Sequence, residues 1–195
     1  MAGATTSTAV ILTAGVAGII AGAISMAAGE YVSVSSSRDT EKALLKKERR
    51  ELKEHPEQEL AELITIYQKK GLTKQTAVKV AKELTAHDAY AAHIDAELRI
   101  DPNNLTNPWH AAFASAVSFL LGAAIPLIAI LLPPVSMRIS VAFVSVLVAL
   151  VITGALSAKI GGANIIQATI RVVVGGALAM AVTYSVGKFF GITGV

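Results

Sequence analysis

Two pairs of glutamates with the same spacing flank a proline, Glu48 and Glu51 before Pro56 and Glu59 and Glu62 after it. Residues three apart share one helical face, and a helical hairpin at Pro56 would bring the two pairs together. Four converging carboxylates can chelate a hard or borderline divalent cation. The alternative is a solvated helix surface, because Glu and Lys are common on exposed helix faces.

Histidines add to this pattern further along the chain. Glu83 and His87 are four residues apart, as are His93 and Glu97, so each pair can offer two metal ligands from one helical face. One such pair is weak evidence of a metal site. Its position close to the glutamate pairs strengthens the hypothesis, although the sequence leaves open whether His87 and His93 bind metal.

A further pair lies in an uncharged stretch near the N-terminus, where Met26 and Glu30 are four residues apart. A soft thioether and a hard carboxylate on one helical face suit a borderline ion such as Fe(II). The alternative interpretation is that Glu30 is an interfacial anchor at a helix end, where a charge costs little.

No catalytic constellation accompanies these residues. The sequence lacks a glycine-rich phosphate loop, a nucleophile elbow and a His-Glu-x-x-His motif. It therefore predicts that the chain is not an enzyme, has no catalytic residues, and is not driven by ATP. The net charge of +3, with bases and acids interleaved, gives no nucleic-acid footprint. No tightly bound cofactor is predicted, and a divalent metal would be a substrate.

The elements that position these residues follow from an uneven distribution of charge. Of 17 basic and 14 acidic residues, 13 of each lie within 38–101. A soluble domain carries charges over its whole surface, so this concentration of charge excludes the class of soluble single-domain proteins. Four uncharged or nearly uncharged stretches are long enough to cross a bilayer: 9–29, 109–132, 139–158 and 164–190. The expected fold is an all-α polytopic membrane helix bundle with a three-helix insert, of which the helices cover 38–54, 57–70 and 73–99.

The domain prediction has three parts: a first membrane helix in 1–37, a helical metal-binding insert in 38–101, and three further membrane helices in 102–195. Cytoplasmic loops are enriched in Lys and Arg, so the insert is expected in the cytosol. With four spans, both termini then lie outside. The chain is expected to be a multi-pass protein of a lipid bilayer.

The segment from Ser25 to Ser33, with Met26 and Glu30, resembles the second membrane helix of the vacuolar iron transporter family. The glutamate-rich run to Pro56, the Ile66-Tyr67-x-x-Lys-Gly71 segment and the Thr85-Ala-His87-Asp88 segment resemble that family's metal-binding insert. Asn107-Pro108-Trp109 and the glycine-containing end of the chain are similar too. The bacterial branch resembles the chain most, which implies a bacterial cell membrane.

The resemblance implies a homodimer that moves Fe(II), and often Mn(II), out of the cytosol by proton antiport. It also implies that the insert holds metal through Glu48, Glu51, Glu59, Glu62 and Glu97, while Met26 and Glu30 line the path. Two methionines of eukaryotic members fall at about His93 and Ile94. His93 is our inferred substitute for their thioethers.

The family has five membrane helices, and its first helix opens with an Asp-Gly segment. Nothing in this sequence matches that segment, so the chain is expected to lack the first helix. A membrane-anchored metal sensor or buffer that does not transport is therefore the alternative function. A structural membrane protein whose insert only mediates assembly is a second alternative.

Overall fold

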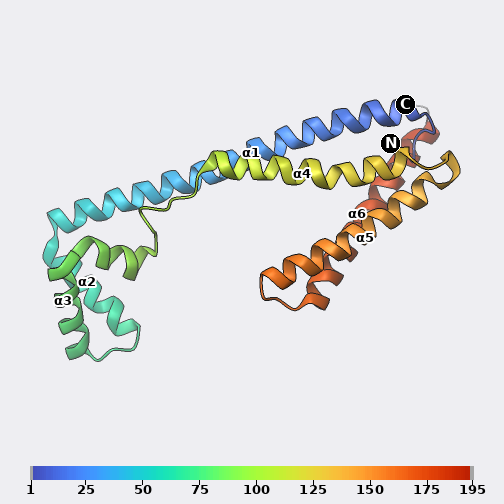
Figure 1. Ribbon diagram of the computed structural model, residues 1–195. Coiled ribbons are helices and arrows are strands. Elements are labelled where there is room, and N and C mark those ends of the chain that lie inside the picture. Colours follow the sequence, from blue (N-terminus) through green and yellow to red (C-terminus); the bar gives the residue numbers. More distant parts are fainter. Residues whose placement is uncertain (1, 194–195) are drawn as a thin grey trace. The chain divides into compact units, whose positions relative to one another are not determined.

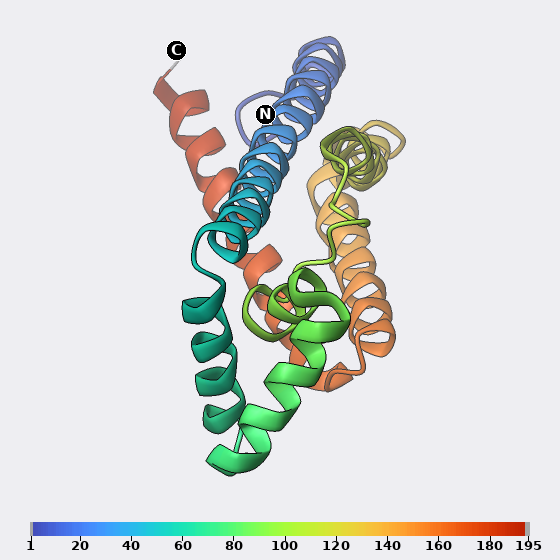
Figure 2. The ribbon, with the colours of Figure 1, turned by 90° about the vertical axis from the view of Figure 1, so that its left-hand side faces the viewer.

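The computed structural model describes residues 2–193, which fold into helices joined by short turns (Figures 1 and 2). No strand occurs within these residues, which confirms the predicted all-α fold. In chain order the helices are α1 (Thr8–Glu54), α2 (Pro56–Lys69), α3 (Lys74–His93), the π-helix η1 (Ile94–Leu98), α4 (Pro108–Leu131), the 3-10 helix η2 (Val135–Met137), α5 (Arg138–Ile160) and α6 (Ile165–Thr193).

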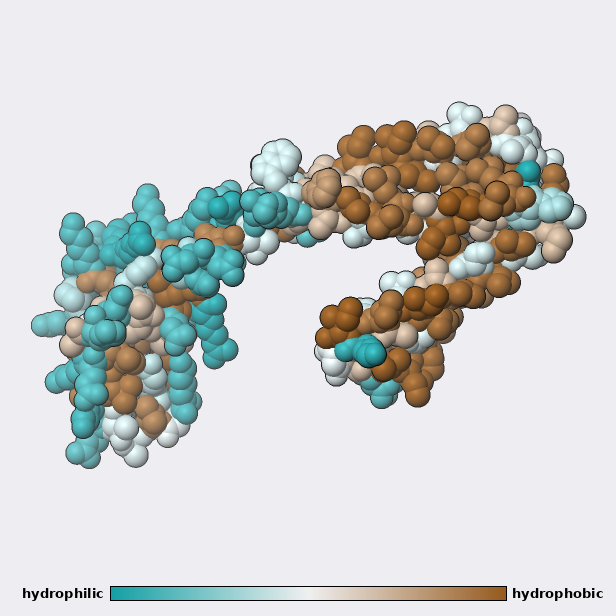
Figure 3. All heavy atoms as spheres, in the orientation of Figure 1, coloured by the Kyte–Doolittle hydropathy of each residue, from teal (hydrophilic) through white to brown (hydrophobic). Residues whose placement is uncertain are grey.

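Four stretches are long and apolar enough to cross a membrane: part of α1, then α4, Val135–Ile160 and Ile165–Gly191. They coincide with the four predicted spans. Figure 3 shows the apolar surface over α4, α5 and α6 and the hydrophilic surface over α2 and α3. The apolar helices α4, α5 and α6 expose many large aliphatic side chains, such as Leu121 and Ile160, as expected where lipid replaces water as the solvent.

The chain divides into two compact units, which we describe separately. The apolar unit comprises the residues up to Ala27 and those from Phe113 onward, and the charged unit is Ala28–Ala112. The boundaries fall within helices, so α1 and α4 each have one part in the apolar unit and one part in the charged unit. The first predicted span and the first predicted insert helix are one continuous helix of 47 residues, because no proline or turn sequence interrupts it before His55-Pro56.

In the apolar unit, α5 and α6 pack against each other at a glycine. A Cβ atom on Gly154 would lie 3.0 Å from the Cα of Thr169, whereas one on Gly175 would meet nothing within 4 Å. Small residues allow membrane helices to approach this closely.

Gly154→Ala should therefore destabilise the apolar unit, by about 1–3 kcal/mol, because a backbone atom cannot move aside cheaply. Gly175→Ala is the matched control, since it adds the same methyl group to open space. The measurement is the thermal unfolding midpoint of both variants in detergent. Equal midpoints would contradict a tight α5–α6 contact.

The charged unit contains the hairpin of α2 and α3, which run antiparallel (Figure 2). The turn matches the sequence prediction: Gly71 has a φ of 101°, which suits glycine, and the Thr73 hydroxyl accepts a hydrogen bond from the Thr76 amide at 3.3 Å. Leu63 and Ala81 of the hairpin form a buried core together with Ala96 of η1.

The third insert helix differs from its prediction, which ran unbroken to about Arg99. Asp88 has non-helical dihedrals (φ −158°, ψ 97°), and its carboxylate caps the next turn by accepting from the Ala91 amide at 2.9 Å. After His93 the helix widens into η1, closed by a bond from the Arg99 amide to the Ile94 carbonyl. These two irregularities redirect the side chains that follow Asp88.

Candidate metal site

Three buried side chains from three helices converge in the charged unit. Glu48 comes from α1, Glu59 from α2 and His93 from the end of α3; their exposed fractions are 3%, 8% and 0%. One ligand atom from each lies within 4.8 Å of the others. His93 Nδ1 is 3.0 Å from Glu48 Oε1 and 3.6 Å from Glu59 Oε2. We refer to these three residues as the buried triad.

Three polar atoms of the buried triad have no hydrogen-bond partner in the described part of the protein. Neither ring nitrogen of His93 has a hydrogen-bond partner among the described residues, and neither does Glu48 Oε1. The 3.0 Å approach of Glu48 to His93 is therefore close but not in hydrogen-bond geometry. Buried polar atoms without partners are costly, and a bound cation would satisfy Glu48 Oε1 together with one ring nitrogen of His93.

Burial also determines the charge state of the triad. Desolvation, followed by repulsion from Glu97 and Glu59, raises the pKa of Glu48 to about 7. Burial raises the pKa of Glu59 and lowers that of His93. His93 is therefore held neutral, the form that donates a lone pair to a metal. One imidazole nitrogen with carboxylate oxygens suits borderline divalent ions.

Further carboxylates lie beside the triad. Glu97 Oε2 is 4.0 Å from His93 Nδ1, and burial with repulsion from Glu62 raises the pKa of Glu97. Glu51 is half-buried and its Oε2 accepts from Lys47 Nζ at 3.0 Å, a contact that raises the pKa of Lys47. Glu62 is exposed on α2. The structure therefore brings together Glu48, Glu59 and His93, with Glu97 adjacent and Glu51 and Glu62 at the rim.

Comparison with known proteins identifies the family. A model of the VIT family matches residues 1–188 of the chain. The chain belongs to the VIT family. A vacuolar iron transporter of Acanthamoeba castellanii is 44% identical over 178 residues, which make up 91% of this chain and 68% of that protein. Vacuolar iron transporter homolog 2.1 of Arabidopsis thaliana is 34% identical over 182 residues, 93% of this chain and 67% of the relative.

The comparisons confirm the family predicted from the sequence. Both relatives are named as transporters, in agreement with the prediction that this VIT-family protein is not an enzyme. Its assignment to the bacterial branch stays a prediction.

Other sequence candidates of this VIT-family protein lie apart from the triad. His87 is exposed, and Glu83 is exposed and faces Lys79 Nζ at 4.0 Å. Met26 and Glu30 lie one turn apart on α1, and both are exposed. No sequence signal predicted the π-helix η1, which follows His93 and carries Glu97. Such helices often occur at functional sites.

The pKa of Glu48 predicts how the stability of the metal-free VIT-family protein depends on pH. Because the folded pKa of about 7 exceeds the ordinary 4.5, the folded state binds the proton more tightly, and stability falls as pH rises from about 4.5 to 7. The raised pKa values of Glu59 and Glu97 act in the same direction. The lowered pKa of His93 opposes them only below its ordinary value of 6.5.

The measurement is the thermal unfolding midpoint of chelator-treated protein in detergent between pH 4.5 and 8. We expect the midpoint to fall with rising pH and Glu48→Gln to flatten the profile. Adding Mn(II) should restore the midpoint at pH 7, since metal binds the deprotonated carboxylates. A midpoint that rises steadily over this range would contradict the assigned burial of Glu48.

Proposed function

We propose that this VIT-family protein transports ferrous iron and related divalent metals, including Mn(II), out of the cytosol. The observation that carries the proposal is the buried triad, in which neutral His93 meets two glutamates, and both ring nitrogens of His93 and Glu48 Oε1 lack hydrogen-bond partners among the described residues. The relatives' names, which specify iron, support the iron part of the proposal. The proposal includes a metal-binding role for the insert, residues 38–101, and a cytosolic location for it. It also places the protein in a bacterial cell membrane.

In this proposal the insert captures metal first. Glu48, Glu59 and His93 supply the inner ligands, Glu97 approaches from η1, and Glu51 and Glu62 add negative charge at the rim. Because burial raises the pKa of Glu48 to about 7, metal binding releases a proton from this site. Metal occupancy therefore depends on cytosolic pH.

The translocation path begins at Met26 and Glu30 on the same helix that carries Glu48. Glu30 is the one acidic residue outside 38–101, and Met26 has an exposed fraction of 46%. A charged group in an apolar helix is costly unless it faces a partner or a polar path. We propose that a second copy of the chain covers this face, so that the path lies between two protomers, and that proton antiport drives the export.

Glu48 and Glu51 are one turn apart on α1 but differ in environment. Glu48→Gln should weaken Mn(II) binding by about tenfold, because a buried charge is lost while an oxygen ligand remains. Glu51→Gln should weaken it less than about threefold, because its carboxylate is at the rim and partly neutralised by Lys47. Isothermal calorimetry on the full chain in detergent measures both. Equal losses would contradict the triad as the inner site.

The test of transport is a proteoliposome assay with a metal-sensitive dye and an imposed pH gradient. Metal flux that increases with the gradient supports an antiporter. The alternative is a membrane-anchored sensor or buffer, which predicts calorimetric metal binding without flux. A metal flux that does not change with the pH gradient would overturn proton coupling. The absence of both metal binding and metal flux would overturn the metal function altogether.

A further inference from the structure

Four basic residues line one face of α1 within the charged unit: Arg38, Lys42, Lys46 and Arg49. Their spacing of four, four and three residues places them in a single stripe. Together with Leu45, Tyr90, Pro102 and Leu105 they line a pocket of about 400 Å³. Among the described residues, no acidic side chain lines this basic pocket.

The cations of the basic pocket are not neutralised by the protein. Within residues 2–193, no carboxylate lies within salt-bridge distance of any of the four, whereas Lys47 and Arg50 on the same helix face Glu51 and Glu54. Like charges one turn apart destabilise a helix. An anion bound in the pocket would offset this repulsion, because it attracts all four cations.

Two hydrogen-bond donors of the pocket are buried without partners in the described part of the chain, Arg38 Nε and the Tyr90 hydroxyl. The Arg49 guanidinium lies 4.5 Å from the centre of the Tyr90 ring, a cation–π contact that orients it. Buried donors without acceptors are costly. Guanidinium, ammonium and phenol donors together match the oxygens of a phosphate group.

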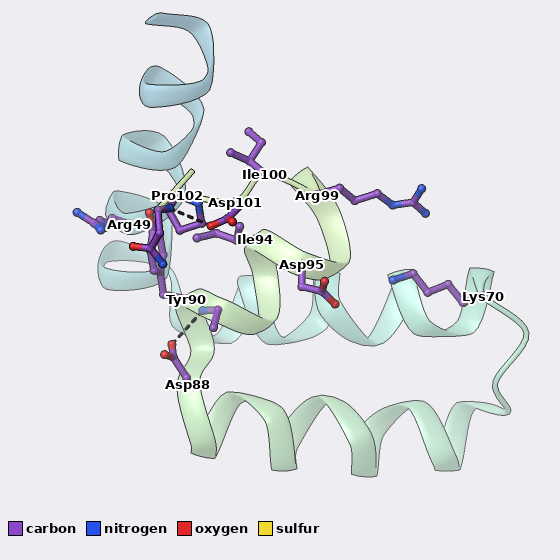
Figure 4. A pocket seen from close by; sticks show the side chains of 12 residues that line it. Arg49, Lys70, Asp88, Tyr90, Ile94, Asp95, Arg99, Ile100, Asp101 and Pro102 are labelled. Carbon is purple, nitrogen blue, oxygen red and sulfur yellow. Dashed lines mark hydrogen bonds between the residues drawn. The ribbon is translucent and has the colours of Figure 1, made fainter. Parts of the chain in front are cut away.

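A neighbouring pocket of about 930 Å³ shares Arg49, Tyr90 and Pro102 but has a different character. In Figure 4, Arg49 projects from α1 with Pro102 next to it, while Lys70 is at the far end of α2. Asp88, Asp95 and Asp101 line that pocket along with its three bases. The excess of positive charge is therefore confined to the smaller, basic pocket.

The basic pocket begins close to the end of the apolar part of α1. The rings of Tyr31 and Trp109 contact each other at 4.7 Å, and such aromatic residues are typical of the membrane–water interface. Arg38 follows Tyr31 by seven residues, roughly 10 Å along a helix axis. This separation places the pocket next to the interfacial region, and basic clusters next to a membrane helix are typical of lipid recognition.

We propose that the basic pocket binds the phosphate group of an anionic ligand. A phosphomonoester of a lipid headgroup and a soluble phosphate share this chemistry, and the experiment below separates them. The proposal is independent of metal transport, because none of the pocket residues belongs to the buried triad.

The experiment measures ligand binding to the full chain in detergent, in metal-free buffer, by microscale thermophoresis. The probes are dioctanoyl phosphatidic acid, dioctanoyl phosphatidylcholine and pyrophosphate. The test variant is Lys42→Gln with Lys46→Gln, two exposed residues of the pocket. The matched control is Arg50→Gln with Lys53→Gln, which removes the same charge from the same helix outside the pocket. Tyr90→Phe removes only the hydroxyl.

We expect phosphatidic acid to bind and phosphatidylcholine not to bind. The test variant should lose roughly thirtyfold in affinity, the control variant less than about threefold, and Tyr90→Phe an intermediate amount. Binding of phosphatidic acid but not pyrophosphate assigns the pocket to a lipid headgroup, and binding of both assigns it to phosphate in general. Equal losses in test and control variants, or no binding of either phosphate probe, would overturn the proposal.

Discussion

Replacing His93 by alanine is expected to lower the affinity of the protein for Fe(II) or Mn(II) by about a hundredfold, the largest effect that we predict on binding. His93 is fully buried and is the one nitrogen ligand of the triad. Its removal leaves only carboxylates, of which Glu48 has a pKa raised to about 7. Removing a residue that only hydrogen-bonds to a metal ligand already lowers metal affinity by about ten- to a hundredfold. Removing a ligand itself should therefore lower the affinity by about a hundredfold.

The matched control is His87→Ala, on the same helix but exposed, which should leave metal affinity unchanged. Calorimetry on the full chain in detergent measures the affinities, and the thermal midpoint shows whether each variant folds. His93→Gln, which keeps a polar side chain in place, provides a second test if the alanine variant unfolds. A folded His93 variant with unaltered affinity would remove the histidine from the site.

Replacing Glu30 by alanine is expected to reduce metal flux into proteoliposomes by about a hundredfold while metal binding to the insert is retained. A dication entering an apolar helix bundle loses its hydration, and at low dielectric a single carboxylate offsets a large part of that cost. Met26→Ala should reduce flux by about tenfold, since a thioether adds selectivity but no charge. The readout is the initial rate of dye response at saturating Mn(II).

Asp39→Asn is the matched control for Glu30, because it removes an exposed acidic residue from the same helix beyond the proposed path. Met137→Ala is the corresponding control for Met26, as Met137 is also exposed. Both controls should transport like the parent protein. Undiminished flux in the Glu30 variant would contradict the proposed path, and lost calorimetric binding in that variant would show that the defect does not lie in transport.

Much of the fold could be predicted because it depends on local composition. Runs of uncharged residues of membrane-spanning length predicted four apolar helices, which the structure contains. The break at Pro56 and the turn with Gly71 and Thr73 were predicted equally well, since the dihedral preferences of these residues are nearly independent of tertiary context. The family was also predictable, from several short motifs in combination.

The environments of the candidate ligands were not predictable from spacing. Glu48 and Glu51 look alike in the sequence, yet Glu48 is buried and Glu51 pairs with Lys47 at the rim. The basic pocket was likewise missed, because Tyr90 reaches Arg49 from a segment some forty residues away in the chain. Contacts of this kind depend on where separate helices meet.

The sequence by itself determined the helices, the apolar spans and the set of residues able to bind metal, because helical period and hydropathy are local properties. Only the tertiary structure decided that His93 joins Glu48 and Glu59 while His87 faces solvent. Both histidines lie four residues from a glutamate, so spacing cannot separate them. The extended Asp88 and the π-helix η1 interrupt the regular helical rotation around His93, and the burial of three helices against one another determines which side chains lose water.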